Sequence, residues 1–307
     1  MDMDNKKATR QSYGEALLEL GKENASVVVF DADLSSATKT SIFAKEFPDR
    51  FFDMGIAEQN MVSTSAGVAT CGKIPYVSTF AMFAAGRAYD QIRNSVCYPN
   101  LNVKICATHA GVTVGEDGAT HQMIEDISLM RTVPNMTVVS TSDNVQTKWA
   151  VKEISKIKGP VYLRLSRLAT PVIYEGNQKF EIGKAVQIGE GIDGAIFATG
   201  VTVSEALKAQ EELKNRNINV RVVDVHTIKP IDREIIIKCA KETKKLISIE
   251  DHNIIGGLGS AIAEVLVEEW PTKLIRLGVK DTFGKSGKAE ELMKYFKITY
   301  NDIVELF

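Results

Sequence analysis

The chain has 307 residues, of which 44% are hydrophobic and 25% charged, a composition typical of a soluble globular protein large enough for two domains. A formal net charge of -2 argues against a nucleic-acid partner, and the apolar runs are too short to cross a membrane. The N-terminus lacks the apolar core of a secretion signal, and the four cysteines show no metal-ligand spacing. We therefore expect a cytoplasmic protein with reduced thiols and no membrane partner.

Strand and helix patterns alternate through residues 1–170, the first predicted domain. Apolar and β-branched runs are separated by amphipathic segments, which predicts a parallel sheet covered by helices on both faces. The predicted strands are residues 25–33, 50–55, 73–80, 101–110, 135–141 and 160–165. The predicted helices are residues 10–24, 57–72, 82–96 and 143–159.

A segment rich in glycine and polar residues, 171–190, reads as a linker to a second domain over residues 191–307. This second domain repeats the alternation of strand and helix. Its predicted strands are residues 195–200, 219–227, 245–251 and 273–279, and its predicted helices are 202–217, 232–243 and 259–270. The predicted fold class is therefore α/β, with two domains built on parallel or mixed sheets.

Polar residues follow several predicted strands of the first domain, among them Asp31, Asp33, Asp53 and Glu58. Because open parallel sheets bind ligands at the carboxyl ends of their strands, these residues are candidates for one shared crevice. Glu58 stands in an otherwise apolar and small-residue run at a strand-to-helix junction. Burying an unpaired charge costs several kcal/mol, so this carboxylate needs a partner or a function.

The loop "THAGVTVGEDGATHQMIED", residues 108–126, holds two of the four histidines and four acids without a hydrophobic period. Long ordered loops tend to carry function, although a solvated connection with histidines that cap turns is an equal alternative. The spacing of His109 and His121 matches no zinc pattern, so we predict no metal site. Phe80 and Phe83 have the spacing of core residues, but at a strand end beside a buried acid they could wall an aromatic-ring pocket.

Two glycine motifs imitate cofactor loops. "GGLGSA" at 256–261 precedes a helix but lacks the third glycine of a dinucleotide-binding loop, so we discount NAD. "GEDG" at 115–118, with Asn135 and Asn144 downstream, imitates the diphosphate-binding GDG…N signature of thiamine enzymes. Glu116 interrupts the GDG tripeptide, so we reject this interpretation as well.

Taken together, the motifs resemble a known family. "DMGIAEQNM", "YVSTFAMFAAGRAYDQIR", "THAGVTVGEDGATHQMIEDISLMRTVPNM" and "VYLRLSR" resemble the pyrimidine-binding domain of transketolase, and "EDHNIIGGLGSAIAEVL" and "DTFGKSGKAEELMKYF" resemble its C-terminal domain. The similarity runs in order from about Arg10 to the end. It implies the C-terminal subunit of a split transketolase, a thiamine diphosphate enzyme that transfers a two-carbon ketol unit between sugar phosphates in the pentose phosphate pathway.

The resemblance implies a role for each matching cofactor residue. Glu58 matches the glutamate that hydrogen-bonds N1′ of the aminopyrimidine ring and so promotes deprotonation of the thiazolium carbon, a general acid/base role. Phe80 and Phe83 match the aromatic residues that pack on that ring, and Asp33 and Leu34 match residues that line the cofactor.

The substrate residues follow in the same way. His121 matches a catalytic histidine near the reacting carbon, Asp117 matches an acid that reads sugar hydroxyl groups, and His109, Arg10 and Arg167 match the phosphate-binding group. The "LSR" triplet favours Arg167 over Arg164 as the phosphate ligand. Where the family often has a serine phosphate contact, this chain has Ala37, which leaves Ser36 or Thr38 as substitutes.

The diphosphate-binding half of transketolase has no counterpart in this sequence. The resemblance therefore implies an N-terminal transketolase subunit that holds the diphosphate and a divalent cation (Mg²⁺ or Ca²⁺) in an α2β2 heterotetramer, with no activity from this chain alone.

Three alternatives stay open. The chain could be the matching half of a 1-deoxyxylulose-5-phosphate synthase, which tends to have "DRAG" where this chain has "THAG". The second alternative is the beta subunit of a 2-oxoacid dehydrogenase, but it lacks the "GEDGATHQ" pattern as a rule. The third is a non-catalytic scaffold with a decayed site, and the joint presence of Glu58, two phenylalanines, two histidines and Asp117 argues against it.

Overall fold

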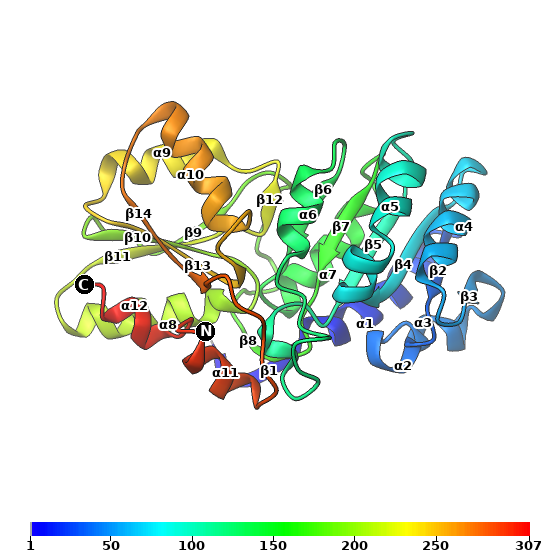
Figure 1. Cartoon of the computed structure of the whole chain (residues 1–307), viewed down its shortest axis with the longest axis horizontal. Helices are drawn as coiled ribbons and strands as arrows, with labels where there is room; N and C mark the ends of the chain where they lie inside the picture. The colour runs from blue at the N-terminus through cyan, green and yellow to red at the C-terminus, as the bar shows by residue number, and fades with distance from the viewer. Residues whose placement is uncertain (1) are drawn as a thin grey trace.

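The computed structural model describes residues 2–307 and shows two α/β domains side by side (Figure 1). The first domain is built on a seven-stranded sheet with the order β12-β6-β7-β5-β4-β2-β3. Its strands are β2 (Val27–Asp31), β3 (Phe51–Asp53), β4 (Ile74–Phe80), β5 (Lys104–Thr108), β6 (Thr137–Ser140), β7 (Val161–Arg164) and β12 (Thr227–Lys229). All run parallel to their neighbours except β12, so the predicted parallel sheet is confirmed.

Helices cover both faces of this sheet because its strands are apolar on both sides. One face packs against α1 (Thr9–Glu23), α3 (Ser41–Glu46) and α7 (Asn144–Ile154). The other packs against α4 (Glu58–Thr70), α6 (Asp126–Thr132) and the segment 82–97. The short α2 (Ser35–Thr38) and a 3-10 turn, Pro48–Arg50, complete the connections between β2 and β3.

The segment 82–97 differs from the single helix predicted at 82–96. It consists of two π-helical stretches, Met82–Arg87 and Ile92–Cys97, on either side of the short α5 (Tyr89–Gln91). Wide-turn hydrogen bonds mark them, from Ala88 N to Phe83 O (3.3 Å) and from Tyr98 N to Arg93 O (2.9 Å). Such π-turns are often found at functional sites. The first stretch ends at Arg87, whose side chain points toward α4 and bonds Glu58.

The second domain has a five-stranded sheet with the order β14-β13-β10-β11-β9. Four strands are parallel, namely β10 (Gly194–Ala198), β11 (Val220–Asp224), β13 (Leu246–Asn253) and β14 (Leu274–Val279), and β9 (Val186–Ile188) is an antiparallel edge. Its helices are α8 (Thr202–Asn215), α11 (Ala289–Tyr295) and α12 (Tyr300–Val304) on one face and α9 (Arg233–Glu242) and α10 (Leu258–Glu269) on the other.

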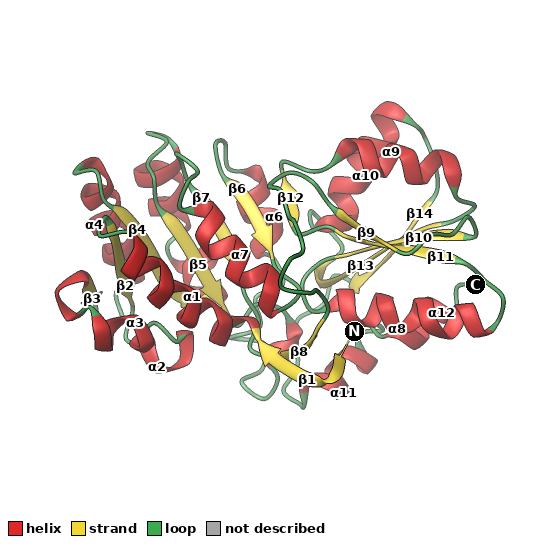
Figure 2. Cartoon of the chain, turned by 180° about the vertical axis from the view of Figure 1, so that it is seen from behind, coloured by secondary structure: helices red, strands yellow, loops and turns green. Residues whose placement is uncertain are grey.

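The two domains are interlocked at their junction (Figure 2). The predicted strand 219–227 divides into β11 in the second sheet and β12, which follows it and joins the edge of the first sheet beside β6. The small two-stranded sheet of β1 (Asp2–Ala8) and β8 (Ala169–Val172) lies at the same junction. The segment 171–190 contains the end of β8 and all of β9. Among the described residues, no helix has the length and apolar character needed to span a bilayer.

Candidate active site

The carboxyl ends of the parallel strands bring four predicted site residues together as one cluster of rings. Phe80 ends β4 and His109 follows β5, which pairs with it in parallel register. The rings of Phe80 and Phe83 are stacked with centroids 5.8 Å apart and an interplanar angle of 15°, and Phe80 stacks on His109 at 3.8 Å. His121 meets Phe83 and Phe80 edge-on at 5.5 and 6.4 Å.

Glu58 begins α4 and is 1% exposed. One guanidinium nitrogen of Arg87, Nη1, donates to both of its carboxylate oxygens at 2.8 Å. The Arg87 side chain is 45% exposed and its guanidinium lies 4.5 Å from the Phe83 ring centroid. Glu58 is thus a buried carboxylate whose charged partner, Arg87, is partly exposed to solvent.

Arg87 is the site residue that the sequence reasoning missed. It lies seven residues after Phe80 inside the quoted "GRAYDQIR" stretch, and a buried acid at Glu58 called for a cationic partner. An ordinary helix over 82–96 gave no reason to place Arg87 against α4, whereas the π-turn does.

The buried carboxylate and the parallel phenyl rings fit one kind of ligand. Two stacked rings, joined to a carboxylate through Arg87, can hold a flat heteroaromatic ring that presents a basic edge nitrogen to Glu58. Arg87 contacts both Glu58 and Phe83, so a ring in that position must displace part of the guanidinium contact.

Asp31 and Asp53 order the loop that carries Asp33 and Leu34. The Asp31 carboxylate accepts the Leu34 N–H at 2.7 Å, and burial raises the pKa of Asp31 to about 6. Asp53 Oδ1 accepts the N–H groups of Asp33 at 3.1 Å and Gly55 at 2.9 Å. Asp33 itself is exposed and has φ of 60°, a left-handed conformation that this loop must hold in place.

The two expected substitutes at Ala37 differ in their accessibility. Thr38 is fully buried and its hydroxyl donates to Asp31 Oδ2 at 2.7 Å, whereas Ser36 is exposed. Ser36 is therefore the one of the two that can reach a ligand. The Ala37 carbonyl accepts from Arg10 Nη1 at 2.9 Å, which brings this loop to the phosphate-binding candidates.

Arg10 and His109 lie in direct contact, with 3.3 Å between Nη1 and Nε2. Burial, followed by the nearby Arg10 and Arg167 guanidinium groups and His121, lowers the pKa of His109 to about 3, so the ring is neutral at pH 7. Burial and then Arg167 also lower the pKa of Arg10. Two guanidinium groups that repel each other beside a neutral imidazole suit a multiply charged anion.

Arg167 is tied to the loop that carries His109, Asp117 and His121. Its Nη1 donates to Val114 O at 2.5 Å and lies 3.3 Å from Glu116 Oε2 and 3.8 Å from Asp117 Oδ2. Arg164, by contrast, is buried and donates to Asp126 Oδ2 and to the backbone oxygen of Asp251, both at 2.8 Å. Across residues 2–307, no group of three or more His, Cys, Asp or Glu side chains is arranged to hold a metal ion.

Two family models match the chain. Residues 5–172 match the transketolase pyrimidine-binding domain, and residues 183–303 match the transketolase C-terminal domain. The matches follow the two domains of the structure.

Individual relatives agree. The chain is 53% identical to a Methanocaldococcus jannaschii protein assigned as a transketolase C-terminal section, over 97% of this chain and 95% of that protein. It is 42% identical to a 6-deoxy-6-sulfo-D-fructose transketolase subunit of Clostridium sp., over 96% and 92%. Human transketolase is 40% identical over 98% of the chain, which spans 48% of that longer protein.

A solved structure agrees as well. A split-gene transketolase described as an inactive β4 tetramer has a TM-score of 0.91 and 51% identity, with 97% of this chain and 96% of that chain covered. The chain belongs to the transketolase family and carries its pyrimidine-binding and C-terminal domains.

Proposed function

We propose that the chain is the C-terminal subunit of a thiamine diphosphate-dependent transketolase made as two polypeptides, which transfers a two-carbon ketol unit between sugar phosphates. The observation that carries the proposal is the buried Glu58, which Arg87 links to the stacked rings of Phe83 and Phe80. His109, His121, Arg10 and Arg167 lie at the same sheet edge, so groups for a cofactor ring and for an anionic substrate adjoin each other.

Glu58, Phe80, Phe83, Asp33 and Leu34 would hold the aminopyrimidine ring. When bound, thiamine diphosphate supplies a nucleophilic carbon and an electron sink for the two-carbon unit. Glu58 holds or releases a proton at its carboxylate toward the ring edge, as a positioned acid/base. The two stacked phenyl rings orient the aminopyrimidine ring.

The substrate residues bind and orient the sugar phosphate. Arg10 and Arg167 donate to the phosphate oxygens, and neutral His109 adds a hydrogen bond without a further charge. His121, whose Nδ1 is 3.0 Å from the Thr120 hydroxyl, moves a proton at a sugar hydroxyl, and Asp117 accepts from another.

A partner completes the site. The chain spans about half the length of the mammalian transketolases it matches and lacks the GDG…N motif. An N-terminal transketolase subunit would supply the diphosphate-binding domain and its divalent cation, Mg²⁺ or Ca²⁺, in an α2β2 assembly. A related split-gene transketolase chain, described as an inactive β4 tetramer, supports this division.

Reconstitution tests the proposal. The purified chain with thiamine diphosphate and Mg²⁺ is expected to show no ketol transfer between xylulose 5-phosphate and ribose 5-phosphate, and an added N-terminal transketolase subunit is expected to establish it. The 6-deoxy-6-sulfo sugar named for the Clostridium relative serves as the competing donor. Turnover by the lone chain would contradict the split site, and turnover of the sulfo sugar alone would contradict the phosphate assignment.

A further inference from the structure

The loop of residues 108–126, called the substrate loop below, is held by a carboxylate of the second domain. Asp251 is buried at the end of β13, and its Oδ1 accepts the Val112 N–H at 2.8 Å. Its Oδ2 accepts the Thr113 hydroxyl at 2.6 Å and the Thr113 N–H at 3.3 Å. One side chain from the second domain therefore fixes two consecutive peptide groups of the loop.

The contact leaves no room for a side chain at Gly111. Gly111 has φ of 81°, and a Cβ atom added there would lie 2.1 Å from Asp251 Oδ2. Val112 and Ile124, from the two arms of the loop, are buried in the hydrophobic core of the second domain. The loop is thus packed into the second domain by apolar side chains and oriented there by Asp251.

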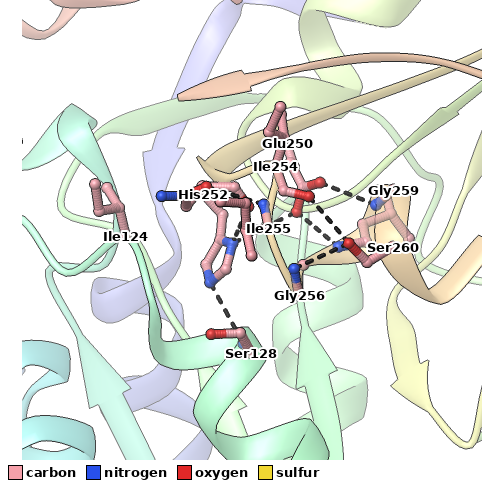
Figure 3. A network of polar contacts seen from close by, with 12 residues as sticks. Ile124, Ser128, Glu250, His252, Ile254, Ile255, Gly256, Gly259 and Ser260 are labelled. Carbon is pink, nitrogen blue, oxygen red and sulfur yellow. Dashed lines mark hydrogen bonds and ion pairs between the residues drawn. The ribbon is translucent and has the colours of Figure 1, made fainter. Parts of the chain in front are cut away.

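A buried guanidinium joins this contact to the end of the loop. Arg164 donates from Nη2 to the backbone oxygen of Asp251 and from Nε to Asp126 Oδ2, each at 2.8 Å. On the next residues of β13 and α6, the Ser128 N–H points at His252 Nε2 at 3.4 Å (Figure 3). Both arms of the loop are therefore held against β13, the first by Asp251 itself and the second through Arg164 and the neighbouring Ser128.

A second set of contacts reaches the loop near its polar tip. Gln122 Nε2 donates to Lys285 O at 2.8 Å, and the Ser286 hydroxyl donates to Glu116 O at 2.5 Å. These bonds lie on either side of Asp117 and His121. The second domain consequently contacts the loop between His109 and Asp117 and again after His121.

On the basis of the proposed function, we propose that Asp251 is a positioning residue for the sugar-phosphate site, acting from the C-terminal domain through the backbone of the substrate loop. His109 has φ of 57°, a conformation that a non-glycine residue keeps only where its surroundings dictate it. Asp251 supplies that constraint three and four residues farther on, at Val112 and Thr113, and Thr113 directly precedes Val114, the carbonyl partner of Arg167. The C-terminal domain thereby sets the distance between the guanidinium groups and the imidazole.

Asp251→Asn tests this role, because the amide keeps the shape but presents an NH₂ group to backbone N–H donors. Asp224→Asn is the matched control. Asp224 is an equally buried carboxylate at a strand end of the second domain, and it accepts from Ser142, Gln146 and Tyr174 but from no residue of the substrate loop among the bonds described.

Two measurements apply to both variants. Hydrogen exchange of loop peptides in the separate chain, taken relative to peptides from the rest of the chain, is expected to speed up for Asp251→Asn and not for Asp224→Asn. In the reconstituted complex, KM for the sugar phosphate is expected to rise about tenfold or more for Asp251→Asn with a smaller fall in kcat, and to stay within about twofold for the control. Thr113→Val, which removes one bond at nearly constant volume, is expected to shift both readouts in the same direction by less.

Unchanged exchange and unchanged KM in both Asp251→Asn and Thr113→Val would overturn the inference, as would equal effects of Asp251→Asn and the control. If Asp251→Asn does not assemble, Thr113→Val decides. A wild-type complex without ketol transfer contradicts the proposed function, and in that case the exchange comparison still determines whether Asp251 positions the loop.

Discussion

Glu58 and Arg87 form an unequal pair, since the carboxylate is buried and the guanidinium is half exposed. Water screens Arg87 and weakens its hold, so the pair can be opened at a modest cost. Glu58 would remain desolvated without a new partner, and a ring nitrogen of a bound cofactor provides one. In the free chain, Arg87 therefore keeps the buried Glu58 carboxylate ordered.

Glu58→Gln is expected to leave the fold and the assembly with the partner intact and to lower turnover by about a hundredfold or more, because an amide cannot exchange a proton with the ring. Steady-state turnover of the reconstituted complex at saturating cofactor measures this. Glu23→Gln, an exposed glutamate paired with Lys152 on the same domain, is the control and is expected to change turnover little. Near-normal turnover of the Glu58→Gln variant would contradict the acid/base role proposed for Glu58.

For single residues, the sequence indicates which ones come together at the site but not which contacts fix their side chains. Strand-end position was enough to select Glu58, Phe80 and His109, because parallel strands present their carboxyl ends on one edge, whereas Arg167 was selected by the family resemblance of the "LSR" triplet. The roles of Arg87 and Asp251 could not be predicted from the sequence. Arg87 is placed by a π-turn, and Asp251 contacts Val112, which lies 139 residues earlier in the chain.

The N-terminus of α10 shows how an element can exclude a ligand. Glu250 lies beneath it and accepts the N–H groups of Leu258 at 2.6 Å and Gly259 at 2.9 Å (Figure 3). A Cβ atom at Gly257 would lie 2.0 Å from Glu250 Oε2. Gly257 of "GGLGSA" thus makes room for the chain's own carboxylate where a dinucleotide loop would hold a phosphate, which agrees with the rejection of NAD.

Glu250 makes stability depend on pH. Burial raises the pKa of Glu250 to about 7, while the Gly259 and Leu258 N–H groups and Arg164 and Arg131 oppose that rise. His252 Nδ1 lies 3.7 Å away, and burial lowers the pKa of His252 to about 4, so that ring is neutral. Between the usual carboxyl pKa and pH 7 the folded chain holds a proton that the unfolded chain releases, so unfolding free energy falls as the pH rises through this window.

Glu250→Gln removes this pH dependence. The variant is expected to be less stable than the wild type at pH 5, and the difference is expected to shrink by on the order of 1–3 kcal/mol by pH 8. Urea unfolding across this range measures it, with Glu264→Gln, an exposed glutamate of α10, as the control. A constant difference between wild type and Glu250→Gln would contradict the assignment.

Elements with a strong local pattern were predictable, and those set by distant partners were not. The apolar strands of both sheets and α1, α7, α8, α9 and α10 follow from periodicity and length. The division of residues 219–227 into β11 and β12 does not, because β12 owes its existence to pairing with β6, about 90 residues earlier.

In the whole molecule, the two domains share more than a connecting segment. Ser140 N donates to His226 O at 2.8 Å beside β12, Asp224 accepts from Ser142 and Gln146, and Asp251 holds the substrate loop. Buried polar groups on each side depend on the other domain for their hydrogen bonds. Opening the junction would leave them unsatisfied, which couples the stability of one domain to that of the other.

This coupling predicts a single unfolding transition. The chain has two tryptophans, Trp149 on α7 of the first domain and Trp270 after α10 of the second, so Trp270→Phe and Trp149→Phe each leave a reporter for one domain. Urea midpoints from the two fluorescence signals are expected to coincide with each other and with the far-UV circular dichroism of the wild type. Asp224→Asn, introduced into both single-tryptophan chains, is expected to lower the two midpoints together, because the bonds it removes join the domains. Midpoints that separate in the otherwise unaltered single-tryptophan chains would mean that each domain is stable alone and that the junction contributes little to the fold.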